Sequence, residues 1–133
     1  MAKQFTLGKK ERLKSRKQIE QLFSSGQRFV ILPFRIFYSY QDQDKDGSIP
    51  LQAGFAASSR VFKTAVERNR VKRLTKEAYR LQKNELQAQL KEQNQRLNVF
   101  FIYIGKEMPA YEEVFKSVRL ALTRLISITN KTS

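Results

Sequence analysis

The spacing of apolar residues along the chain predicts helices alternating with four strands. Apolar residues recur every three or four positions in residues 16–24, from residue 64 onward and again after Pro109, which is the period of a helix with one buried face. Residues 28–31 and 34–40 are rich in aromatic and β-branched side chains, and residues 51–57 and 98–104 are further apolar runs, as strands require. The order α-β-β-β-α-β-α predicts a single α+β domain over residues 1–133, a sandwich of helices packed on a four-stranded sheet. We expect residues 1–10 and 129–133 to be flexible.

Local signals support several of these boundaries. Ser15 followed by Gln18 matches a capping box, and Gly26 is placed to end that short helix. Pro109 suits the first turn of the last helix. Residues 81–97 become rich in Gln and Asn, and the pattern leaves open whether they extend the middle helix or form another.

The strong positive charge of the chain indicates a polyanionic partner. The formal net charge is +14 and the isoelectric point is near 10.3, which favours nucleic acid or an anionic membrane. The apolar runs 29–32 and 99–104 are too short to span a bilayer, and no signal peptide is visible, so we expect a cytoplasmic protein without a membrane partner. The sequence contains no Cys and no His, which removes disulfides, thiolate metal sites and the commonest general base.

The stretch from Arg60 to Arg80 carries eight basic residues against two acidic ones. If it is helical from about Thr64, one sector is apolar and contains Val71, Leu74, Ala78 and Leu81. The opposite sector contains Arg68, Asn69, Lys72, Arg73, Lys76 and Arg80. A merely solvated face usually mixes charge signs, whereas like charges four residues apart repel each other. The Arg-rich row of one sign therefore favours a face that binds RNA or DNA.

A second candidate surface lies on the strand at residues 34–40. Alternation directs Phe34, Ile36 and Tyr38 to one face and Arg35 and Phe37 to the other. An exposed aromatic ring beside a cation suits a single nucleic-acid strand, because bases stack on rings while cations contact phosphates. The alternative, with Phe37 in a core, stays open. So does the choice between a frayed and an RNA-ordered arm at residues 1–10.

The acidic run Asp42-Gln-Asp44-Lys-Asp46-Gly47 imitates the start of an EF-hand loop. Its twelfth position is Ala53 where the motif needs Glu, so a polar hairpin loop is the better interpretation. A self-sufficient metal-dependent nuclease would need these three aspartates as ligands. We predict no metal site and no catalytic residue on this chain.

The run Ala65-Val-Glu-Arg-Asn-Arg-Val-Lys-Arg-Leu74, followed by Lys76-Glu-Ala-Tyr-Arg80, resembles the "RNR" signature of the bacterial ribonuclease P protein component. The resemblance extends over most of the chain. It implies a ribosomal-protein-like fold whose crossover from the third strand to the fourth is left-handed, although such crossovers are right-handed in nearly all proteins. It also implies a protein subunit that binds the catalytic RNA of ribonuclease P and the 5′ leader of precursor tRNA. The RNA would then perform the chemistry and hold the Mg²⁺.

The resemblance also implies roles for individual residues. RNA binding falls to Arg60, Lys63, Arg68, Asn69, Arg70, Lys72, Arg73, Lys76 and Arg80, and leader binding to Phe23, Arg35 and Phe37. Ile19 stands where the family has an aromatic residue, and Ser59 where it has a basic one. The alternative function is a ribosomal or general RNA-binding protein with no catalytic partner. No protein partner is predicted.

Overall fold

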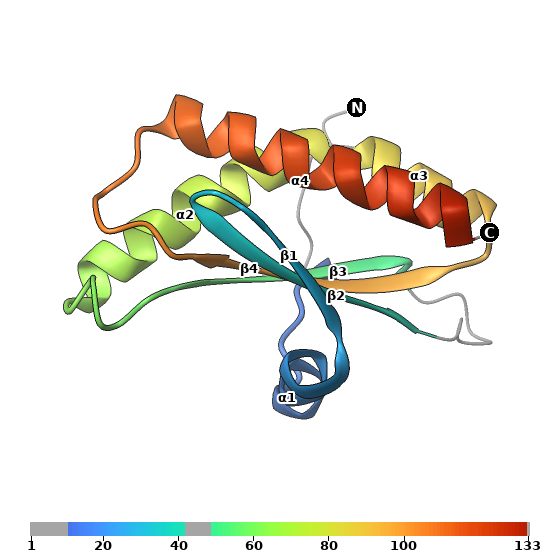
Figure 1. Ribbon diagram of the computed structural model, residues 1–133, viewed down its shortest axis with the longest axis horizontal. Coiled ribbons are helices and arrows are strands. Elements are labelled where there is room, and N and C mark those ends of the chain that lie inside the picture. Colours follow the sequence, from blue (N-terminus) through green and yellow to red (C-terminus); the bar gives the residue numbers. More distant parts are fainter. Residues whose placement is uncertain (1–10, 42–48, 133) are drawn as a thin grey trace.

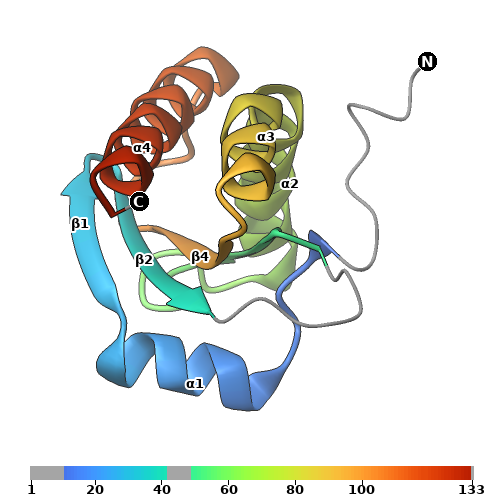
Figure 2. The ribbon, with the colours of Figure 1, turned by 90° about the vertical axis from the view of Figure 1, so that its right-hand side faces the viewer.

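One four-stranded sheet organises the fold, with helices on both of its faces (Figures 1 and 2). The computed structural model describes residues 11–41 and 49–132. Its elements are α1 (Arg16–Ser25), β1 (Gln27–Ile31), β2 (Phe34–Gln41), β3 (Leu51–Ala57), α2 (Ala65–Gln82), α3 (Asn84–Glu92), β4 (Arg96–Tyr103) and α4 (Tyr111–Thr132). The predicted α+β class and all four predicted strands are confirmed.

The strand order is β1-β2-β4-β3, so the last strand lies inside the sheet. The pairs β1–β2 and β2–β4 are antiparallel, whereas β3 and β4 are parallel. Parallel neighbours need a long crossover connection, and here α2 and α3 form it. The left hand of this crossover stays a prediction.

Helices α2, α3 and α4 cover one face of the sheet, and α1 is the one helix of the described residues on the other face (Figure 2). The main core lies between the sheet and the three helices and includes the fully buried Ile36, Tyr79, Phe101 and Leu125. A smaller cluster lies under α1 and consists of Leu13, Leu22, Phe37 and Phe100, which we call the α1 cluster. The central strand β4 contributes to both clusters, so its continuous apolar run is explained by burial on both faces.

The last helix corrects two predictions about its ends. The expected flexible tail from residue 129 is wrong for its first part, because α4 continues to Thr132 and Thr129 is completely buried. The Thr129 hydroxyl donates to the Leu125 carbonyl at 2.8 Å and lies 2.8 Å from the Tyr40 hydroxyl, so a polar side chain is buried without losing hydrogen bonds. Pro109 precedes the helix instead of lying in its first turn, and Ala110 accepts the first helical hydrogen bonds.

The segment left open at residues 81–97 contains a separate helix, α3. Lys83 lies between α2 and α3, and Leu86 and Leu90 of α3 are buried in the main core. The two leucines are four residues apart, which places them on one face of a helix. Residues 1–10 and the acidic run with Asp42, Asp44 and Asp46 lie outside the described residues.

Candidate nucleic-acid interface

Helix α2 is anchored at its start by a side-chain cap and along its length by a buried stripe. The Thr64 hydroxyl accepts a hydrogen bond from the Glu67 amide at 3.2 Å and donates to the Glu67 carboxylate at 3.1 Å, and the first of these bonds satisfies a backbone N–H at the helix N-terminus. The buried residues of α2 are Val71, Thr75, Ala78 and Tyr79. The predicted stripe is therefore wrong at Leu81, which is exposed, and Leu74 is only half-buried. Thr75 can occupy the stripe because its hydroxyl donates to the Val71 carbonyl.

The face of α2 away from this stripe carries a hollow of about 240 Å³ lined by Asn69, Lys72, Arg73 and Lys76. All four were predicted to share one side of the helix, and the structure confirms that they do. A neighbouring hollow of about 200 Å³ is lined by Lys72 and Lys76, by residues of β3, and by Arg12 and Lys14. The last two belong to residues 11–15, which precede α1 and are called the N-terminal segment below. We call the six residues Arg12, Lys14, Asn69, Lys72, Arg73 and Lys76 the cationic surface.

The pKa of Lys76 reflects the crowding of positive charges on the cationic surface. Partial burial lowers the pKa of Lys76, and the nearby charges of Arg12, Lys72 and Lys14 lower it further. Both causes disfavour a positive charge that an anion would stabilise. The surface therefore gathers cations at an electrostatic cost that an anion bound there would offset.

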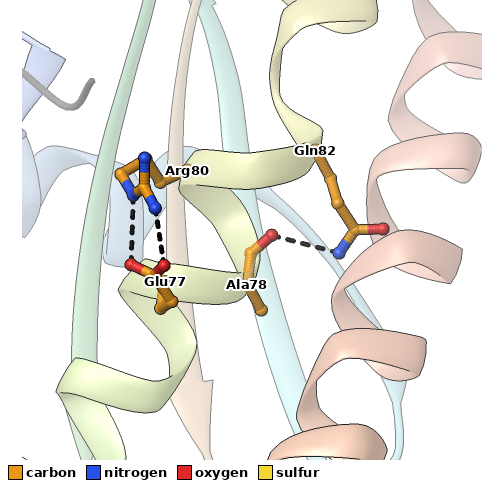
Figure 3. Close-up of polar contacts among 4 residues, drawn as sticks. All are labelled: Glu77, Ala78, Arg80 and Gln82. Carbon is orange, nitrogen blue, oxygen red and sulfur yellow. Dashed lines mark hydrogen bonds and ion pairs between the residues drawn. The ribbon is translucent and has the colours of Figure 1, made fainter. Parts of the chain in front are cut away.

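Two of the predicted RNA-binding arginines already have protein partners. Arg68 donates from Nη1 to the Phe62 carbonyl at 2.7 Å and so ties α2 to the segment before it. Arg80 makes a two-point ion pair with Glu77, with hydrogen bonds of 3.0 and 2.6 Å (Figure 3). This pairing lowers the pKa of the Glu77 carboxyl. Both arginines thus have engaged guanidinium groups, and neither lines the two hollows.

The end of α2 is fixed against α4. The Gln82 side-chain amide donates to the Ala78 carbonyl, as Figure 3 shows, and to the Phe115 carbonyl, both at 3.1 Å. This bridge ties the C-terminal turn of α2 to α4.

The remaining predicted RNA-binding cations are exposed but lie outside the two hollows. Arg60 and Lys63 belong to the connection between β3 and α2, where the Arg60 amide donates to the Ser58 hydroxyl at 3.2 Å. Arg70 is exposed on α2 and lines neither hollow. They extend the positive surface without contributing to its concave part.

The second candidate surface, predicted from Phe23, Arg35 and Phe37 and called the aromatic surface below, is arranged differently from the prediction. Phe37 is only 7% exposed and belongs to the α1 cluster, so the expectation of an exposed ring at this position is wrong. Phe23 of α1 covers it, with ring centroids 4.9 Å apart, and also meets Phe100 edge-on at 5.2 Å. Phe23 itself is 41% exposed. The accessible ring of this site is therefore Phe23, and Phe37 supports it from below.

Neighbouring residues complete the aromatic surface. Arg35 is exposed on β2 two residues from Phe37, on the same face of the sheet, as alternation predicted. Ile19 is half-buried against the α1 cluster. Gly54 pairs with Phe100 across β3 and β4, and a Cβ at this glycine would collide with the Phe100 ring. The absence of a side chain at residue 54 thus lets Phe100 lie against the sheet beneath α1.

Sequence reasoning missed Arg12 and Lys14 as members of the cationic surface. The N-terminal segment looked like an arm, and only its charge pointed toward RNA. Its pairing with β3, where the Leu13 amide donates to the Ala53 carbonyl at 2.8 Å, depends on contacts across 40 residues of chain. Periodicity within a short segment carries no such information.

Within the described residues, no group of three or more Asp or Glu side chains is placed to hold a metal ion. In the same part of the chain, no helix is both long and apolar enough to cross a bilayer. The site is built from cations and aromatic rings, which are ligands for nucleic acid and not for a divalent cation.

The α+β sandwich with a concave cationic helix surface on one side and an aromatic surface on the other defines a class of small, basic nucleic-acid-binding proteins. The family model described as Ribonuclease P matches residues 7–126, and the chain belongs to this family. Proteins of this family are the protein subunit of ribonuclease P, the ribonucleoprotein that processes the 5′ end of tRNA. Between the two functions left open by the sequence, this finding decides for the ribonuclease P subunit, with the ribonuclease P RNA as its partner.

Individual relatives agree with this assignment. The ribonuclease P protein component of Porphyromonas gingivalis is 34% identical over 121 residues, covering 91% of this chain and 87% of the relative. That of Chlorobaculum tepidum is 30% identical over 119 residues, covering 82% and 75%. Among solved structures, the Staphylococcus aureus RNase P protein superposes with a TM-score of 0.66 at 16% identity, covering 86% of this chain and 94% of the other. At that identity the structural match supports the fold alone.

Proposed function

We propose that the cationic surface binds the ribonuclease P RNA. The observation that carries this proposal is the gathering of Arg12, Lys14, Lys72 and Lys76 around one hollow, close enough to lower the pKa of Lys76. A rigid helix with a concave cationic face suits the phosphates of a folded RNA, whose backbone geometry such a face can match. Asn69 and Arg73 add a neutral donor and a planar guanidinium to the same face.

We propose further that the aromatic surface binds the single-stranded 5′ leader of precursor tRNA. Phe23 presents a partly exposed ring held in place by Phe37 and Phe100, and Arg35 lies on the same face of the sheet. Stacking on a ring accepts any base, which suits leaders of varied sequence. Helices α1 and α2 lie on opposite sides of the sheet (Figure 2), an arrangement that would let the protein hold the two RNAs at once.

In this proposal the RNA subunit performs the cleavage and holds the Mg²⁺. The sequence has neither His nor Cys, and the proposed contact surfaces are built from cations and rings. The protein contributes binding energy for RNA and substrate, in the cytoplasm where we expect both to be found.

The test is reconstitution at low magnesium with the cognate RNA subunit and a 5′-extended tRNA. The protein alone should leave the tRNA intact, and addition of the RNA subunit should produce a new tRNA 5′ end. Stoichiometric cleavage by the pure protein alone would contradict the assignment of the chemistry to RNA.

The surface is tested with Lys72→Ala/Arg73→Ala by measuring affinity for the ribonuclease P RNA at a series of salt concentrations. Each lost phosphate contact should reduce the slope of log affinity against log salt by about one, so this variant should lose about two. The matched control is Lys116→Ala/Arg119→Ala, which removes the same charge from exposed positions on α4. Equal losses for both variants would mean that net charge, and not the cationic surface, governs binding.

A further inference from the structure

The N-terminal segment is attached to the domain at several points before α1 begins. Arg12 pairs with Ala53 at the outer edge of β3 as a parallel bridge, and the Leu13 amide donates to the Ala53 carbonyl at 2.8 Å. The Leu13 side chain is 5% exposed in the α1 cluster. The segment thus borders the cationic surface, and its course decides where Arg12 and Lys14 lie.

Charge alone would drive this segment away. Arg12 and Lys14 line a hollow with Lys72 and Lys76, and like charges at such close range repel each other. Leu13 and the backbone pairing with Ala53 hold the middle of the segment but do not pair any charge. A polar attachment through a group of opposite charge would offset this repulsion.

Glu11 makes that attachment. Its carboxylate forms an ion pair with the Lys83 ammonium and accepts a hydrogen bond from the Gln87 side chain at 3.2 Å. The side chains of Lys83 and Glu11 are only 3% and 14% exposed. Lys83 lies between α2 and α3, so the pair joins the N-terminal segment to the far end of the helix that carries the cationic surface.

The burial of this pair makes it more than a surface contact. An exposed ion pair contributes little, whereas a buried one is strongly coupled because removal of one partner leaves the other charged and dehydrated. Lys83 cannot itself reach a phosphate, since it is almost completely enclosed. Its charge is used inside the protein to hold Glu11.

We propose that the Glu11–Lys83 ion pair is a positioning device that holds Arg12 and Lys14 against α2 and so completes the cationic surface for RNA. This inference rests on the proposed function of that surface. Glu11 and Lys83 are positioning residues, because neither would touch RNA.

The test uses the full chain with Glu11→Ala/Lys83→Met, which removes both partners together. The net charge is unchanged and no buried charge is left unpaired, so the variant isolates the attachment. Binding to the ribonuclease P RNA is measured as a function of salt and compared with Arg12→Ala/Lys14→Ala. Both variants should flatten the salt dependence by about two, and combining all four substitutions should flatten it no further.

Amide hydrogen exchange reports the position of the segment independently of RNA. In Glu11→Ala/Lys83→Met the Leu13 amide should lose its protection, whereas the Val71 amide within α2 should keep it. Loss of protection at both would place the effect in the α2–α3 junction and overturn the proposal. Unchanged exchange at Leu13 would also overturn it.

Lys72→Ala/Lys76→Ala distinguishes this proposal from the function on which it rests. If that variant weakens RNA binding and Glu11→Ala/Lys83→Met leaves the salt dependence unchanged, the positioning role is refuted and the cationic surface stands. If Lys72→Ala/Lys76→Ala has no effect on RNA binding, the proposed function is refuted, and exchange at Leu13 still decides whether the pair holds the segment.

Discussion

Phe23→Leu should weaken binding of the holoenzyme to precursor tRNA while leaving the protein folded. The substitution removes the ring that is 41% exposed but keeps an apolar side chain over Phe37 and Phe100. A base stacked on an aromatic ring contributes roughly 1–3 kcal/mol, which corresponds to about a 5- to 150-fold loss of affinity. Phe37→Ala should instead act on stability. Its ring is 7% exposed, and truncation of a buried Phe costs about 3–5 kcal/mol.

The assay compares holoenzyme affinity for tRNAs with and without a leader of several nucleotides. Phe23→Leu should affect only the leader-bearing tRNA, and Phe23→Tyr, which keeps the ring, should bind both like the original protein. Urea unfolding of each free variant separates stability from binding. Two results would refute the assignment of Phe23 to the leader. One is that Phe23→Leu loses equal affinity for the two tRNAs, and the other is that it keeps the original preference for the tRNA with a leader.

Three further predictions concern α2. Arg68→Ala should reduce the free energy of unfolding by about 1.5–3 kcal/mol, because the Arg68 guanidinium donates a hydrogen bond to the Phe62 carbonyl. Arg73 is exposed, so Arg73→Ala should change the free energy of unfolding by no more than about 0.5 kcal/mol. If urea unfolding shows the larger loss for Arg73→Ala, the orientation of the helix is wrong. Lys76→Met should stabilise the free protein at pH 7, because the folded protein lowers the Lys76 pKa and so disfavours its charged form. That advantage should shrink as the pH rises through the lowered pKa toward the ordinary lysine value, and a constant advantage would rule out a charge effect. Tyr79→Phe should be neutral or stabilising, because the Tyr79 hydroxyl is buried and has no hydrogen-bond partner in the described part of the chain; a loss above about 1 kcal/mol would reveal a partner.

The order of elements, apart from the separate helix α3, and the cationic side of α2 could be predicted because both depend on local periodicity. Side chains at positions 69, 72, 73 and 76 share a helix face whatever packs against the other face. The strands were found for the same reason, since alternation and apolar runs are properties of short segments. The signature around residues 65–80 then linked this pattern to a family, which the comparison over residues 7–126 confirms.

Which rings and cations are available for contact was decided by tertiary packing. Alternation placed Phe37 on the correct face of β2, but only the position of α1 shows that Phe23 covers it. Likewise, the pattern assigned Arg68 and Arg80 to an open row, yet the Phe62 carbonyl and the Glu77 carboxylate engage them. Burial and pairing depend on which other element arrives at a face, and periodicity within one segment does not contain that information.

The N-terminal segment shows the same division most clearly. From sequence alone it was a basic arm whose order was left open, and its acidic residue Glu11 had no assigned role. Ala53, at the sheet edge, lies 40 residues along the chain from Leu13, and the buried Lys83 lies 72 residues from Glu11. The sequence by itself determined the charge of this segment, the helices and the strands. Only the folded structure decided that Arg12 and Lys14 lie beside Lys72 and Lys76. The reason is that these long-range contacts form only when the sheet and α2 are assembled.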